Sequence, residues 1–214
     1  MLPMLINFIL FQSIWFGCIL LGNTFLPVAI GLVAFHLYFT KCSKPDVVII
    51  TASVVIGLFV DSMLMAFGVF EFNHSVVVPF LIPPWLVLIW AGFAMTLNHS
   101  LRYFQQKPWL AFVGGSISGP LSYLAGARLG AIEIPLGLWQ TAIIFAVIWG
   151  PLFLLLTQWA KRMNQSIYIQ VKDVQLKEVQ NKNVEIKKVQ AKEFQTKDVE
   201  IKEVQVKQPQ EQKS

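Results

Sequence analysis

Long apolar stretches, separated by short polar segments, occupy the first three quarters of the chain. A helix needs roughly 17 to 25 apolar residues to cross a bilayer core of ~30 Å. Stretches that reach or approach this length are Leu5–Leu21, Phe25–Phe39, Val47–Val69, Val76–Leu97, Trp109–Ala127 and Leu136–Trp159. The pattern predicts an all-α protein, a polytopic transmembrane bundle of about six helices formed by residues 1–160.

The first two stretches follow each other closely, and Gly22–Asn23–Thr24 separates them. Such a short connection predicts a tight helical hairpin. Pro27 falls in the first turn of the second helix, where its missing N–H costs little because that group has no partner within the helix.

A five-residue repeat begins at Ile169 and reads IQVKD, VQLKE, VQNKN, VEIKK and onward, with Lys always in the fourth position. A five-residue step turns a helix by about 140° and flips the face of a strand, so neither form gives one continuous apolar stripe. Residues 161–214 are therefore predicted to be a disordered or low-complexity, lysine- and glutamine-rich tail.

Charge is scarce in the apolar region. Charged residues make up 14% of the chain, against ~25% in an ordinary globular protein, and most of the net charge of +5 comes from the tail. This distribution argues against nucleic-acid binding as the main function, because the first 160 residues carry too few basic side chains to form a basic surface. The basic residues near the ends of the predicted spans fall on one side of the membrane, except for Arg128: Lys41, Lys44, Arg102, Lys107, Lys161 and Arg162. The positive-inside rule then predicts a multi-pass protein of the bacterial inner membrane with both termini cytoplasmic.

Asp61, within the third stretch, is the clearest ionisable residue inside a predicted span. A charged side chain at the centre of a membrane helix costs ~2.5–3.5 kcal/mol and usually faces the bundle interior. Arg128 is predicted at a similar depth, so a pair with Asp61 is expected, with Tyr123, Glu133 and the Glu71/His74 segment nearby. The pair has two interpretations, a buried ion pair that fixes helix register or a substrate or proton site in which Asp61 and Arg128 are catalytic and Tyr123 and Glu133 bind substrate.

A second polar group lies toward the cytoplasm: His36 is near the inner end of the second stretch, and Asn98, His99 and Ser100 end the fourth. His99 is either an interfacial side chain that bonds to lipid headgroups or a general base with Asn98 as a substrate ligand. The depth estimate places it roughly 20 Å from Asp61, too far for a His–Asp dyad. The histidines lack H-x-x-H or H-E-x-x-H spacing, so no metal site and no cofactor are predicted.

The fifth stretch contains Gly115 and Gly119 in GxxxG spacing, followed by Pro120. Small residues four apart let another helix approach closely. The motif indicates tight helix packing, a backbone-lined cavity beside Ser122 and Tyr123, or an interface with a membrane-protein partner or a second copy of the chain.

Three strings, GLFVDSML, PPWLVLIW…TLNHSLRYF and GPLSYLAGARLGAIE, resemble a bacterial family of small inner-membrane proteins described as a domain of unknown function. The resemblance covers residues 1 to about 160 and excludes the tail. It implies the predicted architecture and no established activity. Members are associated with neighbouring genes for enzymes that modify fatty acyl chains, which favours a role connected with membrane lipids.

Three functions remain open from the sequence. The chain is a membrane enzyme or accessory factor acting on lipids, with Asp61, Arg128 or His99 as its reactive groups. Alternatively, it is a small permease or channel lined by Asp61 and Arg128, or a non-catalytic scaffold that binds a partner through the Gly115/Gly119 face.

Overall fold

The computed structural model describes residues 2–40, 43–72 and 81–206, and these residues are helical except for short connections. The elements are α1 (Leu2–Leu21), η1 (Gly22–Phe25), α2 (Leu26–Phe39), α3 (Lys44–Ala66), α4 (Pro84–Leu97), η2 (Arg102–Gln106), α5 (Pro108–Arg128) and α6 (Leu138–Val206), where η denotes a 3₁₀-helix. The described residues contain no β-strand, which confirms the all-α prediction. An isolated antiparallel bridge joins Glu71 to Glu133.

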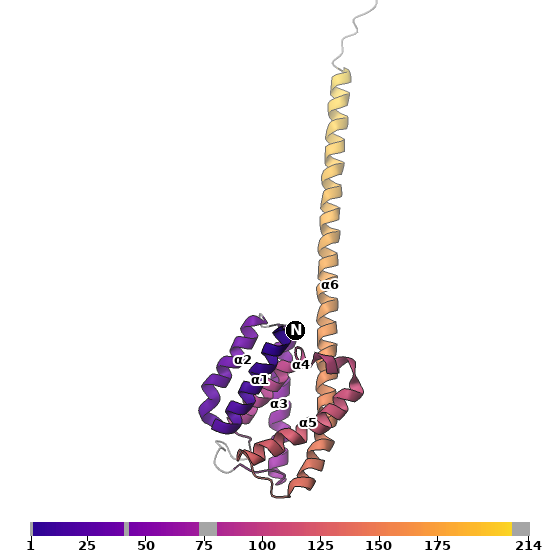
Figure 1. Ribbon diagram of the computed structural model, residues 1–214. Helices are drawn as coiled ribbons and strands as arrows, with labels where there is room; N and C mark the ends of the chain where they lie inside the picture. Colours follow the sequence, from indigo (N-terminus) through magenta and orange to yellow (C-terminus); the bar gives the residue numbers. More distant parts are fainter. Residues whose placement is uncertain (1, 41–42, 73–80, 207–214) are drawn as a thin grey trace, which may run out of the picture. The chain divides into compact units, whose positions relative to one another are not determined.

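The number of helices differs from the prediction. Because α1, η1 and α2 follow one another without a non-helical residue, the described α-helical runs are five: 2–39, Lys44–Ala66, Pro84–Leu97, Pro108–Arg128 and Leu138–Val206. The hairpin nevertheless lies where the sequence placed it, since α1 and α2 run side by side from the turn at η1 (Figure 1). Gly22 makes the turn with a φ of 55°, a conformation that favours glycine.

Three helical stretches are long and apolar enough to cross a membrane: Met4–Phe39, Lys44–Ala66 and Leu138–Lys188. The helix α4 has 14 residues and is a shorter apolar helix. Large apolar side chains cover the outside of these helices; Phe59, for example, is 68% exposed and Val147 67%. A surface this apolar is unusual in a soluble monomer and is typical of helices that face lipid.

Local sequence explains where the helices begin. Ser43 caps α3, because its Oγ accepts a hydrogen bond from the backbone N–H of Asp46. Proline stands in the first turn of α2, α3, α4 and α5, where a helix has N–H groups without intrahelical partners.

The helix α4 forms the centre of the first compact unit, Met1–Gln165, and packs against α1, α2 and α3 (Figure 1). Its side chains Trp85, Trp90, Met95 and Leu97 are almost fully buried. Trp85, in the first turn of α4, is 2% exposed and packs edge-on against Phe72 within the unit.

Gly115 and Gly119 pack against side chains of this same chain. A Cβ added at Gly115 would lie 2.7 Å from Cβ of Phe153, and one added at Gly119 would overlap the side chain of Trp149. Both neighbours belong to α6. The motif therefore provides close packing of α5 against α6, and a partner or second copy could reach this face only by displacing α6.

The second compact unit, Ser166–Ser214, contains the repeat, and its described residues to Val206 are helical. This corrects the expectation of disorder. Lys, Glu and Gln are good helix formers, and the acid in the fifth position of a repeat lies four residues before the next Lys, as in Asp173–Lys177 and Glu178–Lys182. An acid four residues before a Lys stabilises a helix by about 0.2–0.5 kcal/mol per pair. As expected from the 140° step, the repeat's apolar residues form no buried face: Ile169, Val174, Val179 and Val184 are all at least half exposed.

Candidate functional site

Asp61 lies at the centre of a buried network that joins α3, α4 and α5. The Tyr123 hydroxyl donates to Oδ1 of Asp61 at 2.6 Å, and Nε1 of Trp90 donates to Oδ2 at 2.7 Å. The Asp61 residue is 0% exposed. Each carboxylate oxygen thus accepts one short hydrogen bond, which offsets part of the cost of burying the group.

Aromatic stacking holds the two donors in place. The ring of Phe145 stacks on Tyr123 with centroids 3.9 Å apart, and the ring of Trp149 stacks on Trp90 at 5.0 Å. Gly57, one turn before Asp61 on α3, leaves room for the Trp90 ring, because an added Cβ would overlap it. Residues 138–165 of α6 therefore support the donors that α4 and α5 direct toward Asp61.

The predicted pair of Asp61 with Arg128 is wrong. Arg128 is exposed at the last residue of α5, and Asp61 is bonded to Tyr123 and Trp90 instead. Tyr123 and Arg128 are five positions apart on α5, so their side chains point about 140° apart around the helix and only one can face α3. Glu133 is also exposed; its backbone pairs with that of Glu71, and its side chain is not part of the network. His74 lies outside the described residues.

A cavity of about 580 Å³ lies between α1, α4, α5 and α6, within residues 11–153. Aromatic and aliphatic side chains make up most of its wall, and Gln12, Ser118 and Ser122 are among its few polar groups. Trp90 and Tyr123 line the cavity, whereas Asp61 does not. Asp61 therefore lies behind these two side chains and is connected to the cavity wall through its hydrogen bonds with them. Nε1 of Trp15 donates to Oγ of Ser122 at 2.9 Å on another part of the wall.

A second polar cluster surrounds Asp46 at the other end of α3. Its Oδ1 accepts a hydrogen bond from Nδ2 of Asn98 at 2.9 Å, and its Oδ2 lies 3.2 Å from Nε2 of His99. The Ser43 hydroxyl donates to Oδ2 at 2.6 Å. Asp46 is 4% exposed, so its carboxylate interacts with these three partners in place of water. Asn98 in turn accepts from Nδ2 of Asn164 at 2.9 Å.

His36, in the last turn of α2, joins the same cluster. Its Nδ1 lies 3.4 Å from Nδ2 of Asn7, and its ring packs edge-to-face on His99 with centroids 4.9 Å apart. Oδ1 of Asn7 accepts from the hydroxyl and the backbone N–H of Ser100, and Nδ2 of Asn7 donates to the carbonyl of Met95. The cluster therefore joins α1, α2, α3 and the residues after α4.

Sequence reasoning grouped His36 with Asn98 and His99 and missed Asp46. As predicted, His99 belongs to a different group from Asp61, and its carboxylate partner is Asp46. A signal existed: Asp46 opens the third predicted span and His99 follows the fourth, so an antiparallel pair of helices places them at the same end. His36 ends the preceding span and falls at that end too.

These observations define the chain as an all-helical protein with apolar helices compatible with a membrane, an apolar cavity between its helices and two buried carboxylate clusters. No curated protein and no solved structure is detectably similar to it. Residues 4–155 match the family described as protein of unknown function (DUF2878). The chain belongs to that family, as the three strings indicated, and the tail lies outside the match.

Proposed function

We propose that residues 1–160 form a multi-pass transmembrane domain, that residues 161–214 form a cytoplasmic tail, and that the membrane is the bacterial inner membrane. Hydrogen bonds link the start of α1, the start of α3, the residues after α4 and Asn164 of α6 at one end of the first unit. Lys44, Arg102 and Lys161 lie close to these residues in the chain. The excess of positive charge at this end supports a cytoplasmic location for it and for both termini.

The function that the geometry supports best is binding of a lipid acyl chain, in the service of a reaction on membrane lipids. The cavity between α1, α4, α5 and α6 carries this proposal. Its volume of about 580 Å³ falls in the range of small-molecule pockets, roughly 300–1,000 Å³. Acyl chains are the surrounding solvent of a membrane protein, so an apolar cavity within the helices is filled most readily by one of them.

The polar groups on the cavity wall define where a lipid's polar end would lie. Ser122 and the Tyr123 hydroxyl are adjacent on α5, and Trp15 holds the Ser122 side chain. Asp61 fixes the Tyr123 hydroxyl by accepting its hydrogen bond. Asp61 is then a positioning residue rather than a group that touches the lipid, and Arg128, exposed at the helix end, has no part in this site.

The other two functions have weaker support. A permease lined by Asp61 and Arg128 requires these side chains to share a pathway, and Asp61 is bonded to Tyr123 and Trp90. A scaffold that binds through Gly115 and Gly119 requires a free glycine face, and α6 covers it.

A cavity-filling substitution tests the lipid site. Ser118 and the adjacent Ile117 are both exposed on α5, but only Ser118 lines the cavity. Ser118→Trp is expected to fill the space, and Ile117→Trp is the matched control. The full chain would be purified in mild detergent, exposed to a phospholipid with a photoreactive group near the acyl terminus, and irradiated; the attachment sites would be mapped by mass spectrometry.

We expect attachment at cavity residues such as Gln12 in the wild type and in Ile117→Trp, and loss of that attachment in Ser118→Trp. Equal labelling of the cavity in both variants, or labelling confined to exposed side chains, would exclude an acyl-chain site. Lipid profiles of a strain that lacks the gene, complemented with each variant, then separate binding from chemistry. A lipid species altered in the deletion strain and restored by Ile117→Trp alone supports a role in lipid modification.

A further inference from the structure

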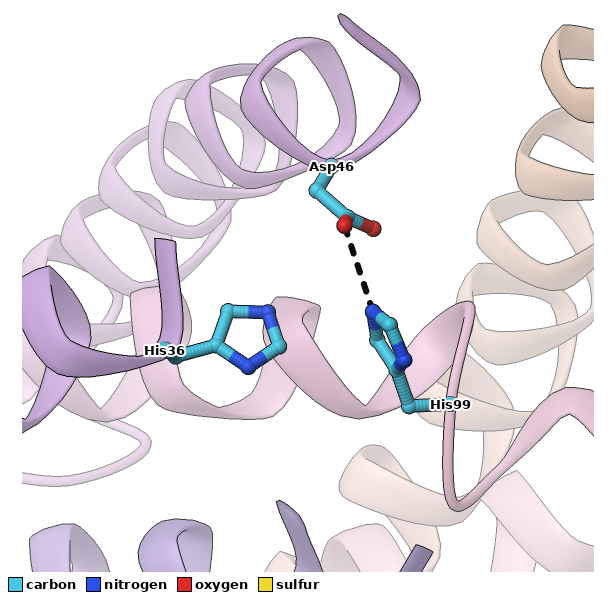
Figure 2. Close-up of side chains that lie close together, drawn as sticks. All are labelled: His36, Asp46 and His99. Atoms are coloured by element: carbon cyan, nitrogen blue, oxygen red, sulfur yellow. Dashed lines mark hydrogen bonds and ion pairs between the residues drawn. The ribbon is translucent and has the colours of Figure 1, made fainter. Parts of the chain in front are cut away.

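We propose that His36, Asp46 and His99 form a binding site for a divalent transition-metal ion such as Zn²⁺. The three side chains come from the end of α2, the start of α3 and the turn after α4, and they point toward one another (Figure 2). This inference does not rest on the lipid site, because none of the three residues lines the cavity.

The spacing of the three ligand atoms fits a single ion. One nitrogen from each histidine and one oxygen from Asp46 all lie within 4.8 Å of one another. Around a tetrahedral zinc ion with bonds of about 2.0–2.2 Å, ligand atoms lie roughly 3.3–3.6 Å apart. Nε2 of His99 and Oδ2 of Asp46, at 3.2 Å, already have this spacing. Closing the remaining separations requires movements of about 1.5 Å or less, which is within reach of a side chain.

His36 supplies the second, independent observation. The residue is 4% exposed, and its Nε2 has no hydrogen-bond partner among the described residues. Leaving a buried polar atom unpaired costs about 1–3 kcal/mol. Nε2 lies on the edge of the ring that faces Asp46 and His99 (Figure 2). An ion pair between His99 and Asp46 alone explains two of the three side chains and leaves this nitrogen unsatisfied, whereas a metal ion engages all three.

Neighbouring side chains form hydrogen bonds with the proposed ligands, as the groups around the ligands of a metal site usually do. Ser43 and Asn98 each donate to Asp46, so the carboxylate is fixed in place before an ion arrives. Coordination through Nε2 requires the proton of His36 on Nδ1, which now faces Nδ2 of Asn7 across 3.4 Å. Metal binding must therefore open or reorient this long contact, a specific cost that the ion has to offset.

The donor set indicates the class of ion and its use. Two imidazoles favour zinc or another transition metal over Mg²⁺ or Ca²⁺, which prefer oxygen ligands. Three protein ligands leave a fourth position for water or a substrate atom, as catalytic zinc sites of two histidines and one carboxylate do. The side chain of His99 is 31% exposed, so this position has access from outside.

Zinc binding by the full chain in detergent tests the site. After removal of metal with a chelator, zinc bound per chain is measured by elemental analysis and affinity by competition with a chelating dye. We expect one zinc per wild-type chain. His36→Gln, Asp46→Asn and His99→Gln should each weaken binding by more than the roughly 10–100-fold expected for loss of an outer-shell group, which Asn98→Ala measures.

His74→Gln, the remaining histidine of the chain, is the control for adventitious binding and should retain wild-type affinity. Cobalt gives a second readout, since its visible absorption in a tetrahedral site should be lost in His36→Gln. The proposal is overturned if the wild type binds no zinc, or if His36→Gln and His74→Gln bind it equally. Where a ligand variant does not fold, the wild type alone decides: saturating zinc should raise its midpoint of thermal unfolding reversibly, and an unchanged midpoint rejects the site.

Discussion

Replacing Tyr123 with Phe isolates one hydrogen bond of the Asp61 network. The substitution removes the hydroxyl that donates to Oδ1 at 2.6 Å and keeps the ring that stacks on Phe145. Asp61 is 0% exposed, so no water replaces the lost donor. A hydrogen bond to a charged group contributes about 1.5–3 kcal/mol. At roughly 2–4 °C per kcal/mol for a domain of this size, the midpoint of thermal unfolding should fall by about 3–12 °C.

The assay is thermal unfolding of the purified full chain, followed by circular dichroism at fixed detergent concentration. Tyr103→Phe is the matched control, because Tyr103 is 57% exposed and its hydroxyl has solvent available. Arg128→Gln should change stability by no more than about 0.5 kcal/mol, as expected for an exposed side chain. The same Tyr123→Phe change in an Asp61→Asn background should cost only about 0.5–1.5 kcal/mol, since the acceptor is then neutral.

Two results would refute this reasoning. If Tyr123→Phe and Tyr103→Phe behave alike, the hydroxyl contributes nothing that solvent cannot replace. If Arg128→Gln destabilises the chain as much as Tyr123→Phe does, the carboxylate's partner is the arginine and the network is wrongly assigned.

Two further predictions concern packing and the tail. Gly115→Ala places a Cβ against Phe153 and the Trp149 carbonyl and should destabilise the fold by about 1–3 kcal/mol. Gly31→Ala has nothing within 4 Å of the added Cβ and should stabilise it by roughly 0.5–1 kcal/mol. The midpoints of thermal unfolding of both variants check this, and equal shifts would contradict it. Lys177→Glu combined with Lys182→Glu turns two favourable acid–Lys pairs into repulsive ones, so helix stability there should fall by about 1–2 kcal/mol. Hydrogen exchange of residues 166–206 measures the change, with Gln170→Glu as the charge control and an unaltered exchange rate as the contrary result.

The sequence predicted the helices well because their signals are local. Apolar runs and proline positions located the helices of residues 2–160, and the short Gly22–Thr24 connection located the hairpin. The contacts between helices were harder, since the depth of a residue along a helix does not give its direction around the axis. Depth alone paired Asp61 with Arg128, whereas the 140° between Tyr123 and Arg128 determines which of them faces Asp61.

The Asp46 cluster shows a second limit. His36, Asp46 and His99 lie in three different elements, and their proximity depends on how α2, α3 and α4 pack rather than on any spacing within one helix. A motif search that requires histidines on one helix face does not detect such a site. The tail shows the reverse: its periodicity was visible, but its helical form depended on pairs four residues apart that a search for an apolar stripe ignores.

The five-residue unit of the tail makes its number of copies a geometric variable. In a helix, one more unit adds about 7.5 Å of length and rotates everything that follows by about 140°. Loss or gain of a single copy therefore makes every residue beyond it point in a different direction around the helix axis. Five copies amount to roughly 700°, only about 20° short of two full rotations. Variants that differ by five units would keep the bearing and change the reach alone, so repeat expansion can adjust distance and direction separately.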